Sequence, residues 1–417
     1  GHHDAAQLKK ERNRAMHAIR NIQRTEANLR LDRIAEAVES APTSAQMFIA
    51  ASQLKRGKPQ QLFVESADGH ILMRDEEKAS RIRDHYQGQF NTSDDLLPPP
   101  APHTLETPVS TEEVEAALRR LRNQKACGPD GVCAELLKYG AEYISPIITT
   151  MINNSITRGD HLCSVIGPGI LIPLPKPNKA RGPVANLRPI VLLNTLRKVI
   201  SLVVLKRITP RVSHYLGSTS SGFRPGRGTA DVVWTQRWIS AKATHFVWDC
   251  HVLGLDMSKA FDTISRTKLL AVMSEITGPD EACLIHHLLY GTTLSVKVGA
   301  TSAEAFVSTL GTPQGDGLSP VLFVCYLEAA LRETRSKLPP RPDTDAAIPQ
   351  ETGYADDISF YSTERQWLAN SLPVIADGLG DWSLNVNSSK TEWLHISAST
   401  TEWRRSKQLG SLLGEEE

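Results

Sequence analysis

The sequence predicts a mixed α+β fold, because strand-like and helix-like segments follow one another along most of the chain. Two strand pairs are indicated: an apolar pair joined by a basic, proline-rich turn over residues 170–194, and a second pair over 353–362. Two helix starts are indicated, a capping box from Ser110 to Glu113 and a cap at Asn194. With 417 residues, of which 40% are hydrophobic, the chain is long enough to bury a sizeable core.

Cysteine spacing and the lengths of the apolar runs argue against a zinc protein and a membrane protein. The net charge of +1 argues by itself neither for nor against nucleic acid as a partner. The six cysteines lack CxxC or Cys/His ligand spacing, so we expect reduced thiols and no zinc site. No apolar run approaches the ~18 residues of a membrane span and no signal peptide opens the chain, so we expect a soluble intracellular protein with no membrane partner. Because the chain starts Gly-His-His, we expect a segment of a longer protein or a tag remnant.

Residues 1–91 are predicted to form an N-terminal helical and basic extension. The basic, helix-like sequence over 5–40 suits a phosphate backbone, but its glutamates make a solvated helix face an equally good interpretation. Residues 61–90 indicate a hairpin turning at Asp68-Gly69 and then a helix. The helix carries apolar residues at four-residue spacing, namely Ile82, Tyr86 and Phe90. A proline-rich linker over 92–109 is expected to end the extension.

Two adjacent carboxylates, Asp356 and Asp357, interrupt the apolar run 353–362 and are expected at the tip of its hairpin. Two negative charges at a half-buried turn repel, and desolvating either without compensation costs on the order of several kcal/mol. A divalent cation is the obvious compensation, since Mg²⁺ prefers carboxylate oxygen and needs few protein carboxylates beside waters and substrate phosphates. An exposed acidic turn is the alternative for such a pair taken by itself.

A second acidic strand end favours the cation. Residues 252–255 form an apolar run that ends at Asp256. Strand ends that present Asp256 and Asp356 side by side would hold two metal ions roughly 3.5–4 Å apart, on the attacking and leaving oxygens of a phosphoryl transfer. Neither segment is specific alone, so the order of the two along the chain carries the hypothesis.

Several motifs of the chain resemble those of a known family. Three of them, in order, resemble core motifs of reverse transcriptases: LDMSKAFD, GTPQGDGLSP and YADD. Two others resemble in particular those of non-LTR (LINE-like) retrotransposons: KACGPDGVCAELLK and LRPIVLLNTLRKVI. The resemblance runs from about residue 110 to about 414. It implies a right-hand polymerase fold with fingers and palm, the palm being a ferredoxin-like sheet with helices on one face, and an absent or truncated thumb.

The resemblance also implies domain boundaries. The fingers would extend over residues 110–215, the palm with the catalytic motifs over 216–400, and the start of the primer-grip region over 401–417. Within the last range, KQLGSLLG resembles the primer-grip hairpin. At the start of the palm, Arg224 and Arg227 lie on a glycine-rich loop whose equivalent in the family approaches the template strand.

Catalytic roles are implied for five residues. Asp256 and Asp356 would bind two Mg²⁺ ions, with Mn²⁺ as an alternative. Asp357 would assist, and Met257 would add a backbone carbonyl to one metal site. Lys390 matches the lysine of the family's next motif, proposed as a general acid for the pyrophosphate leaving group. A surface lysine is the alternative interpretation of Lys390.

Nucleotide-binding roles are implied in three segments. The tip of the basic hairpin would sit over a triphosphate, where Arg188 matches the family's fingers arginine and a rigid fork suits phosphate oxygens. Phe261 matches the aromatic steric gate that crowds a ribose 2′-OH, with a core phenylalanine as the alternative. A second segment rich in glycine, GTPQGDG over residues 311–317, is hereafter the glycine-rich loop; it would bring Gln314 near the nascent base pair and let its backbone approach the nucleotide. The full set is Lys176, Lys179, Arg188, Phe261, Gln314 and Gly315.

The function implied is that of an RNA-directed DNA polymerase (reverse transcriptase) of a non-LTR retrotransposon, extending a primer 3′-OH with dNTPs by a two-metal mechanism. Its partners would be an RNA template, a DNA primer or target, and dNTPs. Its location would be the nucleus, for target-site reverse transcription; the oligomeric state stays open. The first alternative is a catalytically idle, truncated retrotransposon-derived protein that binds nucleic acid. A group II intron maturase or a telomerase-like polymerase is a third reading.

Overall fold

The computed structural model describes residues 62–91, 96–160, 162–396 and the backbone of 404–406, together with 31–43 and scattered positions between 13 and 47. The chain divides into two compact units, residues 1–63 and 64–417. In the first unit, the described residues 31–39 are helical. Most of the basic arm predicted over 5–40 and the primer-grip hairpin predicted over 407–414 lie outside the described residues.

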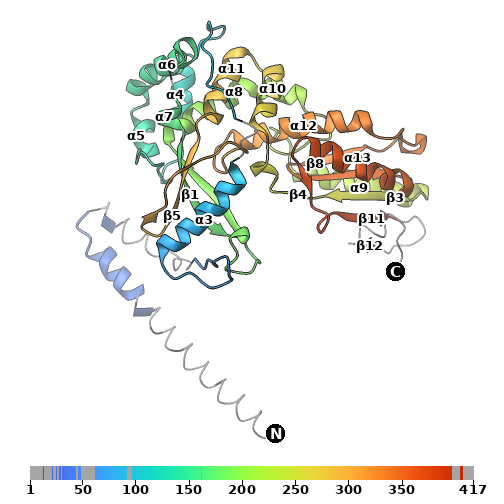
Figure 1. Ribbon diagram of the computed structural model, residues 1–417, viewed down its shortest axis with the longest axis horizontal. Helices are drawn as coiled ribbons and strands as arrows, with labels where there is room; N and C mark the ends of the chain where they lie inside the picture. Colours follow the sequence, from blue (N-terminus) through green and yellow to red (C-terminus); the bar gives the residue numbers. More distant parts are fainter. Residues whose placement is uncertain are drawn as a thin grey trace. The chain divides into compact units, whose positions relative to one another are not determined.

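One sheet of the larger unit, which we call the first sheet, is built on a long antiparallel hairpin (Figure 1). The hairpin consists of β1 (Pro168–Pro175) and β2 (Leu187–Leu193), as the sequence predicts. On its other side β1 pairs in parallel with β5 (Thr293–Val298). Two short strands pair antiparallel with β5, namely β6 (Thr301–Ser302) and β7 (Phe306–Val307).

Helix α3 (Asp75–Phe90) belongs to the same compact unit as the first sheet. Its three predicted core residues are buried: Ile82, Tyr86 and Phe90. The Tyr86 hydroxyl donates to the Leu187 carbonyl of β2 at 3.1 Å, and the Phe90 carbonyl accepts from the loop after β7. Because these contacts tie α3 to the sheet, the chain divides between Phe63 and Val64 and not at the proline-rich segment 92–109.

A helical layer surrounds the long helix α8 (Thr195–Tyr215), which buries Val199, Val203 and Ile208 in the main core as its spacing predicts. The other helices of this layer are α4 (Thr111–Arg119), α5 (Ala134–Tyr139), α6 (Ala141–Arg158), α7 (Cys163–Ile166), α10 (Arg266–Ile276) and α11 (Pro279–Leu289). Within the described residues, no helix is both long enough and apolar enough to pass through a bilayer.

The residues predicted to cap two helices, Ser110 and Asn194, make different contacts. The predicted capping box opens α4: the Ser110 hydroxyl accepts from the Glu113 N–H at 3.3 Å, and the Glu113 carboxylate accepts from the Ser110 N–H at 3.0 Å. Asn194 precedes α8 as predicted, but its side chain does not cap the helix. Its amide instead donates to the Val165 carbonyl at 2.6 Å, so Asn194 links α8 to α7.

A second, antiparallel sheet has the strand order β12-β11-β3-β9-β8. Its strands are β3 (Cys250–Leu255), β8 (Glu351–Tyr354), β9 (Asp357–Ser362), β11 (Glu392–Ile396) and β12 (Arg404–Ser406). Beside it, β4 (Met257–Ser258) pairs with β10 (Asn385–Val386). The chain passes through α12 (Ser319–Lys337) between β3 and β8, and through α13 (Arg365–Asp381) between β9 and β11. The fold is therefore mixed α+β, as the sequence predicts.

Helices cover both faces of the second sheet. Leu253 and Leu255 of β3 join the main core, which also contains the buried residues of α12 and α13. Cys250 and Val252 face the other way and pack with α9 (Thr229–Phe246). The expectation of helices on one face is thus corrected: β3 is apolar on both faces, so each face needs a cover.

Two histidines face each other on adjacent strands of this sheet. His251 of β3 lies opposite His395 of β11, with ring centroids 4.5 Å apart. The Trp393 ring stacks against His251 at 5.6 Å. His251 is buried, and this burial, followed by the neighbouring His395 imidazole, lowers the pKa of His251 to about 4. His251 is therefore neutral in the folded protein over a pH range in which an exposed histidine is protonated.

We expect acidification from pH 6.5 to about 4 to destabilise the protein through His251. In this window the unfolded chain takes up a proton that the folded state does not, so the free energy of unfolding falls as the pH falls. The loss amounts to about 3 kcal/mol once the pH is below both pKa values. His251→Phe keeps the ring stacking and should flatten this part of the profile, as measured by chemical denaturation across the pH range. Equal pH slopes for the parent, His251→Phe and a surface control, His70→Phe, would contradict the assignment.

Candidate active site

The predicted acidic strand ends meet at one end of the second sheet. β3 pairs with β9 so that Leu255 lies opposite Ile358, and Asp256 is the residue that follows Leu255. The hairpin between β8 and β9 turns through Ala355 and Asp356, and Tyr354 pairs with Asp357 across the turn. Antiparallel register therefore brings Asp256 to the strand end that carries the Asp356-Asp357 turn.

The charges of Asp356 and Asp256 act on the Asp357 carboxyl. Partial burial raises the pKa of the Asp357 carboxyl, and the negative charges of Asp356 and Asp256 raise it further. Lys390 compensates part of this charge, since its ammonium donates to Asp256 Oδ2 at 2.8 Å. Asn387 donates to the same oxygen at 3.3 Å. The predicted Lys390 thus lies against the acidic cluster, although its side chain is 56% exposed.

These oxygen donors fit a hard divalent cation. The negative charges of Asp356 and Asp256 disfavour the ionised form of Asp357, and a bound cation would relieve this repulsion. Within the described part of the chain, no three His, Cys, Asp or Glu side chains are grouped so as to enclose a metal ion. Mg²⁺ suits such an open site, because it keeps several waters and takes further ligands from substrate phosphates. Met257, predicted to add a carbonyl, is buried and pairs with Val386 immediately after Asp256.

A cavity of about 210 Å³ lies beside the acidic cluster and is hereafter the basic cavity. Asp356 and Met257 line it on the side of the cluster, and Lys176 and Arg188 line it from the β1–β2 hairpin. The remaining lining residues are His85, Tyr86, Gln89, Ala185, Leu187, Pro189, Lys259, Ala260, Phe261, Asp262 and Gln314. Burial, followed by the nearby Lys259 charge, lowers the pKa of Lys176, which indicates that the cationic groups crowd one another.

The predicted nucleotide-binding residues are only partly brought together. Lys176, Arg188, Phe261 and Gln314 line the basic cavity. Lys179 is exposed in the turn of the β1–β2 hairpin and is not among the lining residues. Gly315 is not among them either.

Gly315 allows its loop to pack closely against β2. Its φ is +135°, and a Cβ at this position would lie 2.4 Å from the carbonyl oxygen of Val191 on β2. The same strand residue donates its N–H to the Gln314 carbonyl at 2.7 Å. Glycine is thus required for the loop to lie against β2, which holds the neighbouring Gln314 at the cavity.

Phe261 packs against core aromatic residues and also faces the basic cavity. Its ring stacks on Phe323 of α12, with centroids 4.2 Å apart, and meets the edge of Phe223 at 6.3 Å. It packs against the main core and also lines the basic cavity. Aromatic neighbours therefore fix the ring at the cavity wall.

Several cavity residues were not predicted from the sequence, and those with side chains able to bind or position a ligand include His85, Gln89, Lys259 and Asp262. Lys259 and Asp262 stand inside the LDMSKAFD motif, so their position was a usable signal. No signal of this kind marks His85 or Gln89, which belong to a segment that was assigned to the N-terminal extension. Their place at the cavity follows from the packing of α3 against the first sheet.

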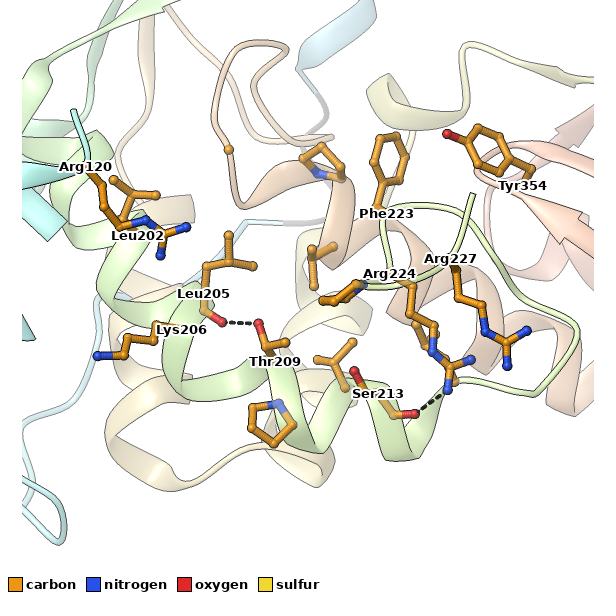
Figure 2. Close-up of a pocket in the computed structure, with 17 residues that line it drawn as sticks. Arg120, Leu202, Leu205, Lys206, Thr209, Ser213, Phe223, Arg224, Arg227 and Tyr354 are labelled. Atoms are coloured by element: carbon orange, nitrogen blue, oxygen red, sulfur yellow. Dashed lines mark hydrogen bonds between the residues drawn. The ribbon is translucent and has the colours of Figure 1, made fainter. Parts of the chain in front are cut away.

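A larger cavity, of about 670 Å³, lies between α8, the loop 217–228 and the start of α12 (Figure 2). The two predicted loop arginines line it, and Figure 2 shows them side by side. Arg224 donates to the Ser213 carbonyl at 2.7 Å and to the Gly217 carbonyl at 2.8 Å, so its guanidinium is held by the protein. Arg227 is more exposed and donates to the Ser218 carbonyl at 3.3 Å.

The loop with these arginines is joined to the acidic hairpin. Ser220 bridges to Gly353, and the Ser221 N–H donates to the Gly353 carbonyl at 2.9 Å. Gly222 lies so close to the Ala355 backbone that a Cβ would come within 2.2 Å of the Ala355 nitrogen. The loop that lines the larger cavity is therefore hydrogen-bonded to the hairpin that carries Asp356.

An acidic cluster suited to divalent cations, beside a cavity with lysine and arginine side chains, defines the class of site that transfers phosphoryl groups. Comparison with known families matches residues 174–412 to the family described as "Reverse transcriptase (RNA-dependent DNA polymerase)". The chain belongs to this family.

Curated relatives include several non-LTR retrotransposon proteins. The chain is 24% identical over 403 residues to "Probable RNA-directed DNA polymerase from transposon BS" of Drosophila melanogaster, covering 91% of this chain and 44% of the relative. It is 25% identical over 292 residues to the "Retrovirus-related Pol polyprotein from type-2 retrotransposable element R2DM" of the same organism, covering 69% of this chain and 27% of the relative. The chain thus spans less than half of the length of these relatives.

Among solved structures, the chain is similar to a telomerase from Candida tropicalis in complex with a TWJ fragment of telomeric RNA. The identity is 14% and the TM-score 0.44, with 58% of this chain and 45% of that chain covered.

Proposed function

We propose that this chain is the polymerase part of a non-LTR retrotransposon reverse transcriptase, which extends a primer 3′-OH with dNTPs on an RNA template. The observation that carries the proposal is the meeting of Asp256 with Asp356 and Asp357 beside the basic cavity. The names of the curated relatives support the same activity. The partners proposed are an RNA template, a DNA primer or target and dNTPs, and the location proposed is the nucleus.

In this proposal the second sheet is the palm and the β1–β2 hairpin belongs to the fingers. The order β11-β3-β9-β8, with helices between β3 and β8 and between β9 and β11, fits a ferredoxin-like palm. The acidic turn lies at the end of its central strands. The basic cavity lies where the hairpin approaches this turn, because it is lined by Arg188 from β2 and Asp356 from the palm.

Each residue then has a defined task. Asp256 and Asp356 would hold Mg²⁺, which when bound supplies charge stabilisation to the phosphoryl oxygens. Arg188 and Lys176 bind the triphosphate and fix it for in-line attack. Lys390, held at Asp256, keeps an ammonium group beside the cluster and is the proposed proton donor to the leaving group.

Primer extension on an RNA template with dNTPs and Mg²⁺ tests the proposed function. Template-dependent products that require all four dNTPs would support it. Binding of the primer–template without extension would contradict it and would favour the idle, nucleic-acid-binding alternative.

Phe261→Ala is expected to relax selection against ribonucleotides. Because the ring is fixed at the cavity wall by Phe323, its removal opens space that a 2′-OH can occupy. We expect the preference for dNTP over rNTP, measured as the ratio of kcat/KM values, to fall roughly tenfold to a hundredfold. Phe223→Ala is the matched control, since this ring touches Phe261 but does not line the basic cavity. An unchanged preference in Phe261→Ala would contradict the steric-gate role.

A further inference from the structure

We infer that α3 contributes a functional residue to the basic cavity. Gln89 of α3 and Asp262 are positioning residues that hold Gln314 and Lys259 in place. The inference rests on the proposed function, because it assigns further residues to the same nucleotide site. It concerns a helix that lies outside the residues matched to the family, 174–412.

A chain of hydrogen bonds crosses the cavity wall. Gln314 Nε2 donates to Asp262 Oδ1 at 3.0 Å, and Gln89 Nε2 donates to Asp262 Oδ2 at 2.9 Å. Lys259 Nζ in turn donates to Gln89 Oε1 at 2.7 Å. Asp262 therefore uses one oxygen for the glycine-rich loop and the other for α3, and Gln89 connects it to Lys259.

The donor and acceptor types allow only one arrangement of these three hydrogen bonds. An ionised carboxylate only accepts hydrogen bonds and an ammonium only donates them. Gln89 lies between the two, so its amide nitrogen must face Asp262 and its carbonyl must face Lys259. Gln314 must likewise turn its amide nitrogen to Asp262. Both amide orientations are thus dictated by charge, which makes the geometry at the cavity specific.

Because Asp262 is buried, the loss of any of these hydrogen bonds would be costly. Asp262 is 6% exposed, and its burial raises the pKa of the carboxyl to about 6 against the opposing hydrogen bonds and the charges of Lys259 and Lys176. Loss of one donor would leave a carboxylate oxygen buried without a partner. Gln314 would then be free to reorient, and Lys259 would lose the acceptor that holds it at the cavity.

The position of α3 is fixed independently of Gln89. The Tyr86 hydroxyl bonds to Leu187 of β2, and the Phe90 carbonyl accepts the N–H groups of Thr309 and Leu310. His85, Tyr86 and Gln89 lie on one side of the helix, as their spacing requires, and all three line the cavity. The helix is therefore anchored by other contacts, which leaves Gln89 available for a role at the site.

The test compares Gln89→Met with Gln87→Met. Both replace glutamine on α3 by an apolar side chain of similar length, but Gln87 is exposed and does not line the cavity. In primer extension we expect Gln89→Met to raise KM for dNTP about tenfold with kcat within about twofold, because one hydrogen bond to a charged group is lost. Gln87→Met should match the parent. In a Gln314→Met background, Gln89→Met should add less than twofold.

Equal behaviour of the two α3 variants would overturn the inference, as would effects of Gln89→Met and Gln314→Met that simply multiply. A parallel loss of kcat and thermal stability would assign Gln89 to the fold and also overturn it. The same variants are measured for equilibrium binding of a fluorescent dNTP with Mg²⁺. A parent that binds dNTP but extends no primer contradicts the polymerase function, and the Kd ratio of the Gln89→Met and Gln87→Met variants then decides the inference.

Discussion

Asp356→Asn is expected to reduce primer extension by about a thousandfold or more, since loss of a metal-binding charge removes several kcal/mol of transition-state stabilisation. Asparagine keeps the size of the side chain and its place at the turn between β8 and β9. The negative charge alone is lost, together with its effect in raising the pKa of Asp357. Single-turnover extension on an RNA template measures the change in the chemical step.

The matched control for this prediction is Asp377→Asn, which makes the same chemical change on the exposed side of α13. It should retain the activity of the parent. Binding of the primer–template, measured for all three proteins, should be similar, because the acidic cluster adds no attraction for a phosphate backbone. Retention of more than a tenth of the parent's rate by Asp356→Asn would contradict the two-metal assignment.

The position of Asp256 and Asp356 was predictable because it depends on local features. Each stands where an apolar strand ends, and two such strands paired in register must present their ends together. The tight turn before α3 was predictable for the same reason: Gly69 has a φ of +82°, a conformation that glycine adopts without strain.

The role of α3 was not predictable from local features. The bond from Gln89 to Asp262 joins residues that are 173 positions apart. A proline-rich segment lies between them in sequence and suggested a domain boundary, but prolines limit helix and strand and say nothing about whether flanking segments pack. Gly315 shows a similar limit, because a glycine in this loop predicted that the backbone approaches a nucleotide and did not indicate that β2 is its neighbour.

The buried ion pair between Arg197 and Asp316 was not predicted from the sequence either. Arg197 lies within the apolar stripe of α8, where the helical pattern predicts core residues. It is 1% exposed and pairs with Asp316 of the glycine-rich loop, its Nε donating to Oδ2 at 3.0 Å. Asp316 Oδ1 also accepts from the Leu318 N–H at 3.1 Å. The pair thus joins α8 to the loop that carries Gln314.

Arg197→Met is accordingly expected to lower the free energy of unfolding by about 3–5 kcal/mol, because Asp316 would remain buried with an uncompensated charge. Arg211→Met is the matched control on the same helix: the Arg211 side chain is 52% exposed and lies 3.4 Å from Glu281, so its loss should cost less than about 1 kcal/mol. Chemical denaturation measures both. The double variant Arg197→Met/Asp316→Leu removes both charges and should be more stable than Arg197→Met alone, since the unpaired carboxylate is the main cost. If Arg197→Met and Arg211→Met were equally destabilising, the buried pair would not hold the loop, and α8 would depend on its apolar contacts there.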